Sequence, residues 1–65
     1  MLEIRWLNTF ATLAKERHFG RAAVALHTTQ PNVSLQIKQL EEMVGVRLFE
    51  RNPFAITYAG QRLLD

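Results

Sequence analysis

Residues 29–44 read TQPNVSLQIKQLEEMV and carry the signals of one well-marked helix. Thr29 is a hydroxyl residue suited to capping a helix, and a proline two positions later is tolerated where the N–H groups have no intrahelical acceptor. Gly45 follows, where a left-handed residue often ends a helix. The apolar residues at helical spacing are Val33, Ile37, Leu40 and Val44. We therefore predict a helix over residues 30–44 with one buried face.

The opposite face of this helix has a different chemistry. At about 100° per residue, the side chains far from Val33 are those of Pro31, Ser34, Leu35, Lys38 and Glu42. Toward the N-terminus the outward residues are small, amide, hydroxyl or basic, which suits approach to a grooved polyanion, whereas Glu41 and Glu42 lie toward the other end. An ordinary solvated helix face explains this segment equally well when it is taken alone.

Composition limits the class of protein. The chain has 65 residues, 48% hydrophobic and 22% charged, which indicates one small globular domain. No stretch approaches the roughly 20 apolar residues that cross a bilayer, and no export signal is evident, so we expect a cytoplasmic protein without a membrane partner. The absence of cysteine excludes disulfides and thiolate metal sites, and the net charge of +2 only weakly indicates an acidic partner.

Two further helices are predicted before residue 29. Residues 3–17 form an amphipathic helix whose apolar stripe is Leu2, Trp6, Leu7, Phe10, Leu13 and Ala14. Its aromatic residues could stack on bases, but packing is the better interpretation at helical spacing. Ile4 lies off the stripe, where a neighbouring element or subunit could cover it. Residues 21–26 form a short helix with Ala22, Ala23 and Leu26 inward, and residues 27–29 complete a helix-turn-helix arrangement.

The segment after Gly45 predicts a small wing. Residues 46–51 and 55–57 could pair as strands around a turn at residues 52–54. The side chains expected to close the core are those of Leu48, Phe49 and Ile56. Arg51 and Asn52 would project toward a second row of phosphates.

A last helix is predicted at residues 58–65, with Thr57 as its cap. Ala59 and Leu63 share a face of this helix and need a partner. Gly60 is expected to weaken it.

Candidate catalytic and metal-binding residues are few. His18 and His27 have no carboxylate at a metal-ligand spacing, and Ser34 has no neighbouring histidine. The glycines are too dispersed for a phosphate-cradling loop. We therefore predict no enzyme and no metal or cofactor site in this chain.

Binding to duplex DNA fits the residues better. The amides of Gln30 and Asn32 and the hydroxyl of Ser34 can meet base edges, and Lys38 suits a phosphate. Pro31 and Leu35 offer only apolar contact, of the kind that meets a thymine methyl.

A series of motifs spans the chain from the second predicted helix to the last residues. They are Phe19-Gly20-Arg21-Ala22-Ala23, Leu26-His27, Gln30-Pro31-Asn32-Val33-Ser34, Gln36-Ile37, Leu40-Glu41, Gly45-Val46-Arg47-Leu48-Phe49-Glu50-Arg51, and Thr57 with Ala59-Gly60. In this order they closely resemble the N-terminal DNA-binding domain of LysR-type transcriptional regulators.

The resemblance implies a bacterial, mainly α-helical winged helix-turn-helix with a three-helix core, a short two-stranded wing and the start of a linker helix. Residues 1–57 would be the DNA-binding domain, and residues 58–65 would begin the linker that pairs subunits. Regulators of this family bind double-stranded DNA as dimers or tetramers. A C-terminal domain, expected outside these residues, binds a small-molecule co-inducer and thereby controls activation or repression of transcription.

Residue chemistry and resemblance together predict which side chains meet DNA. Base contacts are expected from Gln30, Pro31, Asn32, Ser34 and Leu35. Backbone contacts are expected from Gly20, Arg21, Thr29, Lys38, Arg51 and Asn52.

Three features depart from the family pattern. Leu35 stands where arginine is usual, so no guanidinium contact is expected there. Gly20 stands where serine or threonine is usual; it can cap a helix but has no hydroxyl for a phosphate. The wing segment 52–56 is shorter than usual and lacks a basic tip. A competing interpretation is a winged-helix protein-interaction module in which Leu35 belongs to an apolar docking patch.

Overall fold

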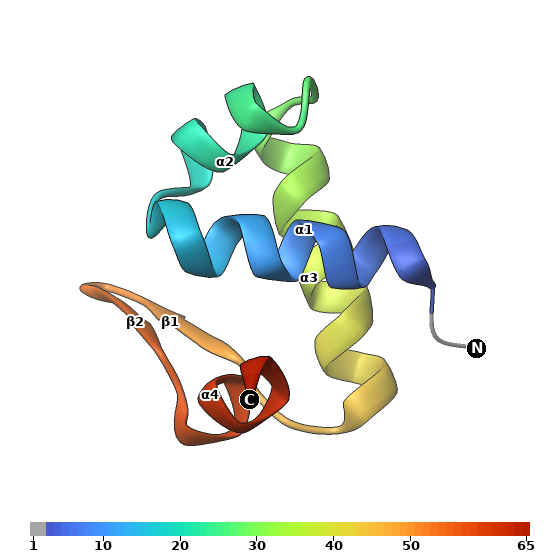
Figure 1. Cartoon of the computed structure of the whole chain (residues 1–65), viewed down its shortest axis with the longest axis vertical. Helices are drawn as coiled ribbons and strands as arrows, with labels where there is room; N and C mark the ends of the chain where they lie inside the picture. Colours follow the sequence, from blue (N-terminus) through green and yellow to red (C-terminus); the bar gives the residue numbers. More distant parts are fainter. Residues whose placement is uncertain (1–2) are drawn as a thin grey trace.

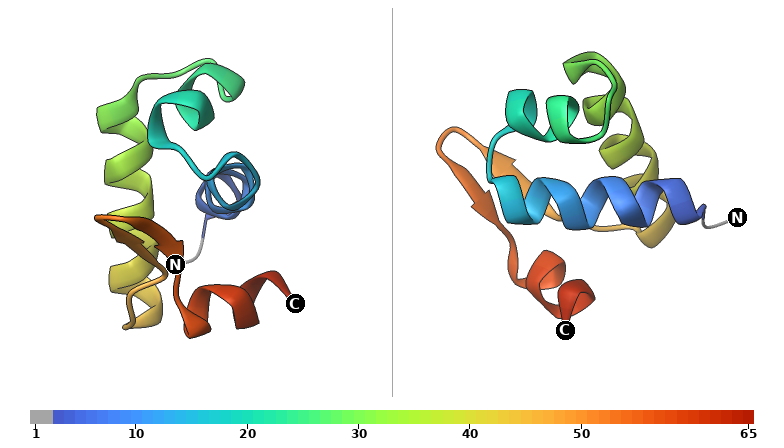
Figure 2. Two further views of the ribbon diagram at one scale, coloured as in Figure 1. Left: turned by 90° about the vertical axis from the view of Figure 1, so that its left-hand side faces the viewer. Right: turned by 45° about the horizontal axis from the view of Figure 1, so that its top comes forward.

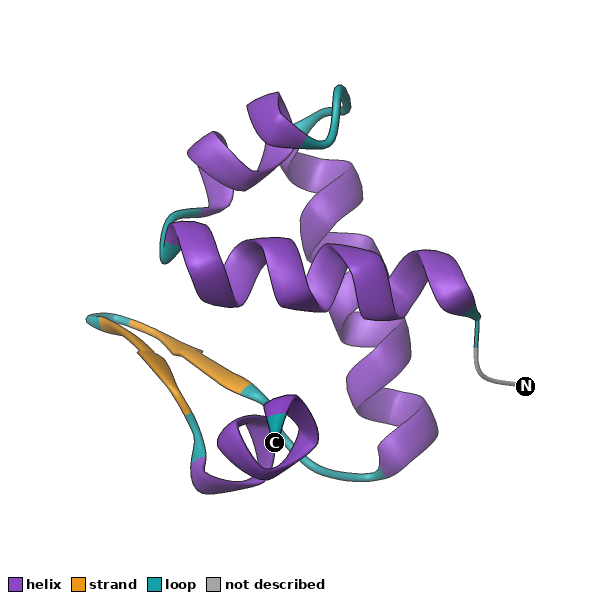
Figure 3. Cartoon of the chain, viewed as in Figure 1, coloured by secondary structure: helices purple, strands orange, loops and turns teal. Residues whose placement is uncertain are grey.

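The computed structural model describes residues 3–65 and has a mainly helical fold with one hairpin, as predicted. Its elements in chain order are α1 (Ile4–Glu16), α2 (Phe19–Ala25), α3 (Gln30–Val44), β1 (Phe49–Arg51), β2 (Phe54–Ile56) and α4 (Tyr58–Leu64). Helix α1 crosses α3, while α2 packs at one end of this pair (Figure 1). Figure 3 shows the two strands and α4 together on the side of α1 opposite to α2. No helix among residues 3–65 is long and apolar enough to cross a membrane.

Helix α1 begins and ends within one residue of the predicted bounds. It buries the predicted apolar stripe. Phe10 and Leu13 are fully buried, and Trp6, Leu7 and Ala14 pack against the core. Leu2, which the sequence assigns to the same stripe, lies outside the described residues. Ile4 is 84% exposed, so the expectation that another element covers it is wrong for the described part of this chain. The sequence pattern also missed Thr9, which is buried and donates its hydroxyl to Oε1 of Gln36 on α3.

Helix α3 has the predicted ends. Oγ1 of Thr29 accepts a hydrogen bond from the backbone N–H of Asn32 at 3.3 Å, and Gly45 ends the helix at φ 80°. The buried side chains are those of Val33, Ile37 and Leu40. Val44 is 42% exposed, so its assignment to the core is wrong. The reason is visible in Figure 1, where the last turn of α3 extends beyond α1 and has no helix to pack against.

Helix α2 begins two residues earlier than predicted, at Phe19. His18 caps it, because its Nδ1 accepts from the backbone N–H of Arg21 at 3.1 Å. Gly20 therefore lies inside the first turn, and the expectation that it could act as the cap is wrong. Ala22 and Ala23 are buried against α1 and α3, and their small side chains allow the three helices to approach closely.

The hairpin is antiparallel and shorter than predicted on its first strand. Its pairs are Phe49 with Ile56, Glu50 with Ala55, and Arg51 with Phe54. Val46, expected in the first strand, is 45% exposed in the loop before it. Phe54 belongs to β2 rather than to the turn, because its ring packs 5.3 Å from that of Phe49. That contact and the 5.3 Å contact between Phe49 and Phe10 join the wing to α1.

Helix α4 starts at the predicted cap, where Oγ1 of Thr57 accepts from the backbone N–H of Gly60. Gly60 has a role that the sequence did not reveal. A Cβ at this position would lie 2.4 Å from the carbonyl oxygen of Leu48 and 2.7 Å from Cγ1 of Ile56. The glycine therefore permits α4 to pack directly on the wing, instead of only weakening the helix. Leu63 is 42% exposed, which agrees with the expectation that the apolar residues of this helix need a partner that the chain does not obviously supply.

We predict that Gly60→Ala destabilises the domain by about 1–3 kcal/mol, because the added methyl overlaps backbone that cannot move aside cheaply. Urea unfolding followed by circular dichroism measures this. Gln61→Ala, at an exposed position of the same helix, is the control and should change stability by less than about 0.5 kcal/mol. Equal stability of the Gly60→Ala and wild-type proteins would contradict the close packing of α4 on the wing.

Candidate nucleic-acid interface

The outward face of α3 and the hairpin border one shallow groove. Pro31, Leu35 and Lys38 are exposed on this face, and Ser34 is half-buried beside them. The left view of Figure 2 shows α3 along one edge of the molecule with the hairpin beside it. The groove is lined by Phe19, Pro31, Ser34, Leu35, Ile37, Lys38, Glu41, Arg47, Phe49 and Arg51. The structure therefore brings three of the predicted base-contacting residues together with two of the predicted backbone-contacting residues.

Gln30, the first residue of α3, is exposed and precedes the groove-lining Pro31, but it does not itself line the groove. Its Oε1 lies 3.6 Å from the position that a Cβ on Gly20 would occupy. The same Cβ would lie only 2.9 Å from Cε1 of His18, the cap of α2. Gly20 thus leaves space for the His18 cap beside the Gln30 amide, a role not evident from its sequence pattern.

Asn32 lies apart from the other predicted base-contacting residues. Its Nδ2 donates to Oγ1 of Thr28 at 2.9 Å, in a second hollow formed by α1, the turn and α3. Asn32 and Ser34 lie on opposite flanks of α3, since a step of two positions along a helix turns by about 200°. The amide therefore strengthens the turn that joins α2 to α3, at the margin of the face that carries Pro31 and Leu35.

Two of the predicted backbone-contacting residues, Arg21 and Arg51, have intramolecular partners that hold them in place. Arg21 donates from Nη2 to the carbonyl oxygen of Glu16 at 2.6 Å, at the C-terminal end of α1. The guanidinium of Arg51 lies 4.4 Å above the ring of Phe19. Thr29 is exposed at the start of α3, and Asn52 is exposed in the wing turn.

Phe19 links the wing to the helix-turn-helix, a contact that the sequence did not reveal. One face of its ring meets Arg51, and the ring of Phe54 lies 6.0 Å away in an edge-on arrangement. The guanidinium of Arg17 lies 5.4 Å from the ring of Phe54. These contacts hold positive charge at the outer end of the hairpin, where the residue chemistry predicted a projecting charged tip at Arg51 and Asn52.

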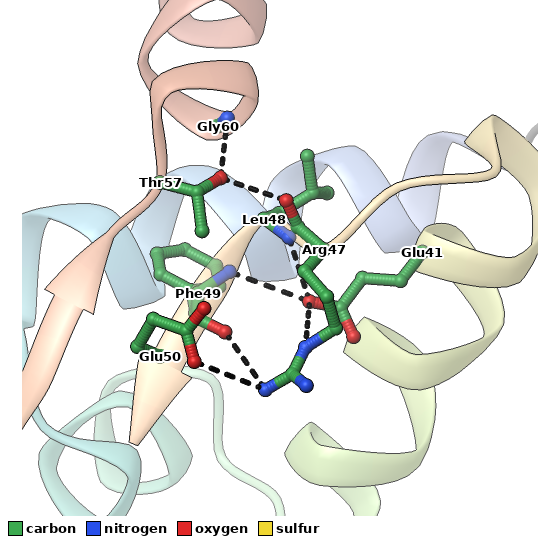
Figure 4. Close-up of polar contacts among 7 residues, drawn as sticks. All are labelled: Glu41, Arg47, Leu48, Phe49, Glu50, Thr57 and Gly60. Atoms are coloured by element: carbon green, nitrogen blue, oxygen red, sulfur yellow. Dashed lines mark hydrogen bonds and ion pairs between the residues drawn. The ribbon is translucent and has the colours of Figure 1, made fainter. Parts of the chain in front are cut away.

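Glu41 fixes the position of the wing relative to α3. Its Oε2 accepts from the backbone N–H of Leu48 at 2.8 Å and from that of Phe49 at 3.3 Å (Figure 4). The side chain is only 17% exposed, and Nε of Arg47 lies 4.0 Å from the same oxygen. Sequence reasoning placed Glu41 with Glu42 as an acidic pair. The one local signal that separates them is that Glu41 directly follows the buried Leu40 on the inner flank of α3.

The charges around the groove favour a polyanion. Lys38, Arg47 and Arg51 border it, and the carboxylate of Glu41 is occupied by backbone N–H groups and Arg47. Arg47 also pairs with Glu50 at 3.5 Å, on the wing side. In residues 3–65 there is no group of three histidine, aspartate or glutamate residues that could hold a metal ion. The groove therefore offers hydrogen bonding, apolar contact and positive charge.

Comparison with known proteins identifies the family. Residues 4–61 match the family described as "Bacterial regulatory helix-turn-helix protein, lysR family". The chain belongs to the lysR family. The transcriptional regulator CfxR of Cupriavidus necator is 51% identical over an alignment of 65 positions, which covers 97% of this chain and 20% of that protein. This lysR-family chain thus spans about a fifth of the length of the curated relatives it matches.

Solved lysR-family structures have the same fold. Vibrio fischeri DarR in complex with DNA has a TM-score of 0.93 and 37% identity, covering 97% of this chain and 22% of DarR. The complex of the BenM DNA-binding domain with catB site 1 DNA has a TM-score of 0.90 and 38% identity, covering 95% of this chain and 72% of that one. The resemblance recognised in the sequence is therefore confirmed.

We predict that Glu41→Ala loosens the wing and lowers the free energy of unfolding by about 1–3 kcal/mol, because two part-buried N–H groups lose their acceptor. Chemical denaturation measures the loss. Glu42→Ala, at the exposed neighbouring glutamate, is the matched control and should be nearly neutral. If both variants unfold alike, Glu41 does not hold the wing.

Proposed function

We propose that this chain is the sequence-specific, double-stranded DNA-binding domain of a bacterial LysR-type transcriptional regulator. The observation that carries the proposal is the exposed, groove-forming face of α3, which has amide, hydroxyl and apolar groups flanked by cations. Membership of the lysR family, in which DarR and the BenM DNA-binding domain have been crystallised with DNA, supports the same function.

Helix α3 would lie in the major groove of the duplex, which is about 12 Å wide and admits an α-helix. Gln30 and Ser34 would hydrogen-bond to base edges, and Pro31 and Leu35 would make apolar contact. Asn32 would reach a base or phosphate at the margin of this face through the second N–H of its amide, or a base through Oδ1, while its other N–H stays bonded to Thr28.

Contacts to the backbone would position α3 on the duplex. The residues we assign to phosphates are Gly20 through its backbone N–H, Arg21, Thr29, Lys38, Arg51 and Asn52. Lys38 lies one helical turn beyond Ser34 and at the rim of the groove. Arg51, held by Phe19, would meet the backbone beside the wing.

The rest of the regulator is proposed from the family. Because the chain spans about a fifth of its relatives, we propose that a C-terminal domain binds a small-molecule co-inducer and that the fragment itself carries no cofactor. Residues 1–57 would bind DNA, and residues 58–65 would begin a linker that pairs subunits into a dimer or tetramer. The protein would act in the bacterial cytoplasm, where its DNA partner is, and would have no enzymatic activity.

Two observations favour a second candidate. Leu35 is 52% exposed at the centre of the groove face, and the net charge is only +2. A winged-helix protein-interaction module would use this leucine to dock another protein. The two candidates differ in how binding responds to salt, because only DNA binding releases condensed counterions.

We predict that affinity for duplex DNA falls with salt at a slope of about −0.9 in log K against log salt for each phosphate neutralised. Fluorescence anisotropy with a labelled duplex measures the slope. Lys38→Ala should reduce it by about one unit. Arg62→Ala, which removes one positive charge from α4, should leave it unchanged. Affinity independent of salt would reject DNA as the partner and favour the protein-interaction module.

A second prediction concerns association. Helix α4 has 7 residues, and its Tyr58, Leu63 and Leu64 side chains are 78%, 42% and 42% exposed. Two turns offer too little apolar area for a tight pairing. We expect the 65-residue chain to be monomeric at low micromolar concentration in sedimentation velocity. A tight dimer at that concentration would contradict this expectation.

A further inference from the structure

We infer that this domain recognises its DNA site through thymine methyl groups, which pack against an apolar pair formed by Pro31 and Leu35. The inference rests on the proposed function and adds to it the chemistry of the base pairs that α3 selects. It predicts that the DNA positions facing α3 are rich in A·T pairs. It does not predict a guanine that is read by a guanidinium group.

The first observation is geometric. Pro31 and Leu35 are four residues apart on α3, so they are neighbours on one helical face. Both are exposed, both line the groove, and Leu35 is 52% exposed although it is a large apolar residue. The C5-methyl of thymine is the one apolar group that a standard base pair presents in the major groove. An exposed apolar pair on the reading helix is therefore complementary to thymine.

The second observation concerns the basic side chains around this pair and the contacts that they already make. Guanine is read most often by arginine or lysine, which donate to O6 and N7. Lys38 is the single basic residue in α3 and lies three positions beyond Leu35 toward the C-terminus. On the opposite wall, Arg47 donates to the carbonyl oxygen of Phe49 at 3.3 Å and Arg51 lies over Phe19. The centre of the face thus has no guanidinium group poised for guanine.

The third observation concerns the polar groups beside the apolar pair. Gln30 lies one residue before Pro31 and is exposed, and its amide can bond in two places to N6 and N7 of adenine. Ser34 precedes Leu35 and can either donate or accept. An adenine read by Gln30 places a thymine on the opposite strand of the same pair. Polar and apolar contacts on this face therefore select the same base pairs.

The test begins with the 65-residue chain and a pool of random duplexes, from which bound sequences are selected and read. We expect the selected site to contain thymines at fixed positions. Each thymine is then replaced singly by deoxyuridine, which keeps base pairing and removes only the methyl. At one or two positions the affinity should fall about fourfold, the effect of losing one buried methyl.

Substitutions in α3 connect the effect to Leu35. Leu35→Ala should bind thymine and deoxyuridine duplexes about equally at one of the sensitive positions. Gln61→Ala, an exposed change on α4 outside the groove, should keep the full preference. Selection with Leu35→Arg should replace a thymine by guanine at that position. Circular dichroism of each variant verifies folding, which an exposed position should not disturb.

The outcomes separate this inference from the proposed function. Salt-dependent selection of a defined site in which no deoxyuridine substitution weakens binding would overturn methyl reading and leave DNA binding intact. Methyl reading by Leu35 is also overturned if Leu35→Ala retains the thymine preference. Failure to select or bind any duplex would overturn both the proposed function and the inference.

Discussion

Burial of one face of α3 organises the molecule. Val33, Ile37 and Leu40 lie in the centre of a core to which α1, α2 and the wing all contribute. The small side chains of Ala22 and Ala23 allow α2 to approach this face closely, and Phe10 and Leu13 cover it from α1. Because these contacts consume one face of α3, the opposite face is left outside the core. The packing that stabilises the domain also determines which residues are available for recognition.

The wing is held to this core by polar as well as apolar contacts. Glu41 accepts from two backbone N–H groups at the start of β1, and Thr57 donates to the carbonyl oxygen of Arg47 while capping α4 (Figure 4). The phenylalanine contacts continue from Phe49 through Phe54 to Phe19 on α2. The outer end of the wing is therefore tied to the start of α2, and Arg51 is held at the groove instead of extending freely into solvent. Such preorganisation lowers the conformational entropy lost on binding.

The recognition face of this lysR-family chain depends less on charge than the resemblance would imply. With leucine at position 35 and one lysine in α3, positive charge lies at the rim of the groove and apolar and amide groups lie at its centre. Under the proposed function, charge at the rim would favour affinity for any duplex, whereas the centre would discriminate among base pairs. The two tasks would then be carried out by different residues on the same surface.

The sequence by itself determined the helices, the caps of α3 and α4 and the class of fold, because these depend on residues close together in the chain. The apolar spacing in α3, the cap at Thr29 and the end at Gly45 all agree with the structure. The same local reasoning identified the exposed face with Pro31, Ser34, Leu35 and Lys38. Its errors reflect a missing contact or a different local one: Val44 lies beyond the core, and the short-range bond from the backbone N–H of Arg21 to His18 caps α2 in place of Gly20.

Only the tertiary structure decided how the parts of the site are placed. Glu41 and Glu42 are adjacent and chemically identical, yet one is bonded to the wing and the other is exposed. Gly60 is a poor helix residue by propensity, but its missing side chain allows the carbonyl oxygen of Leu48, in another segment, to approach α4 closely. Asn32 shares a motif with Gln30 and Ser34, but helix geometry turns it toward Thr28. These roles depend on contacts between residues far apart in the chain or on opposite flanks of a helix, which become definite only once the core has packed.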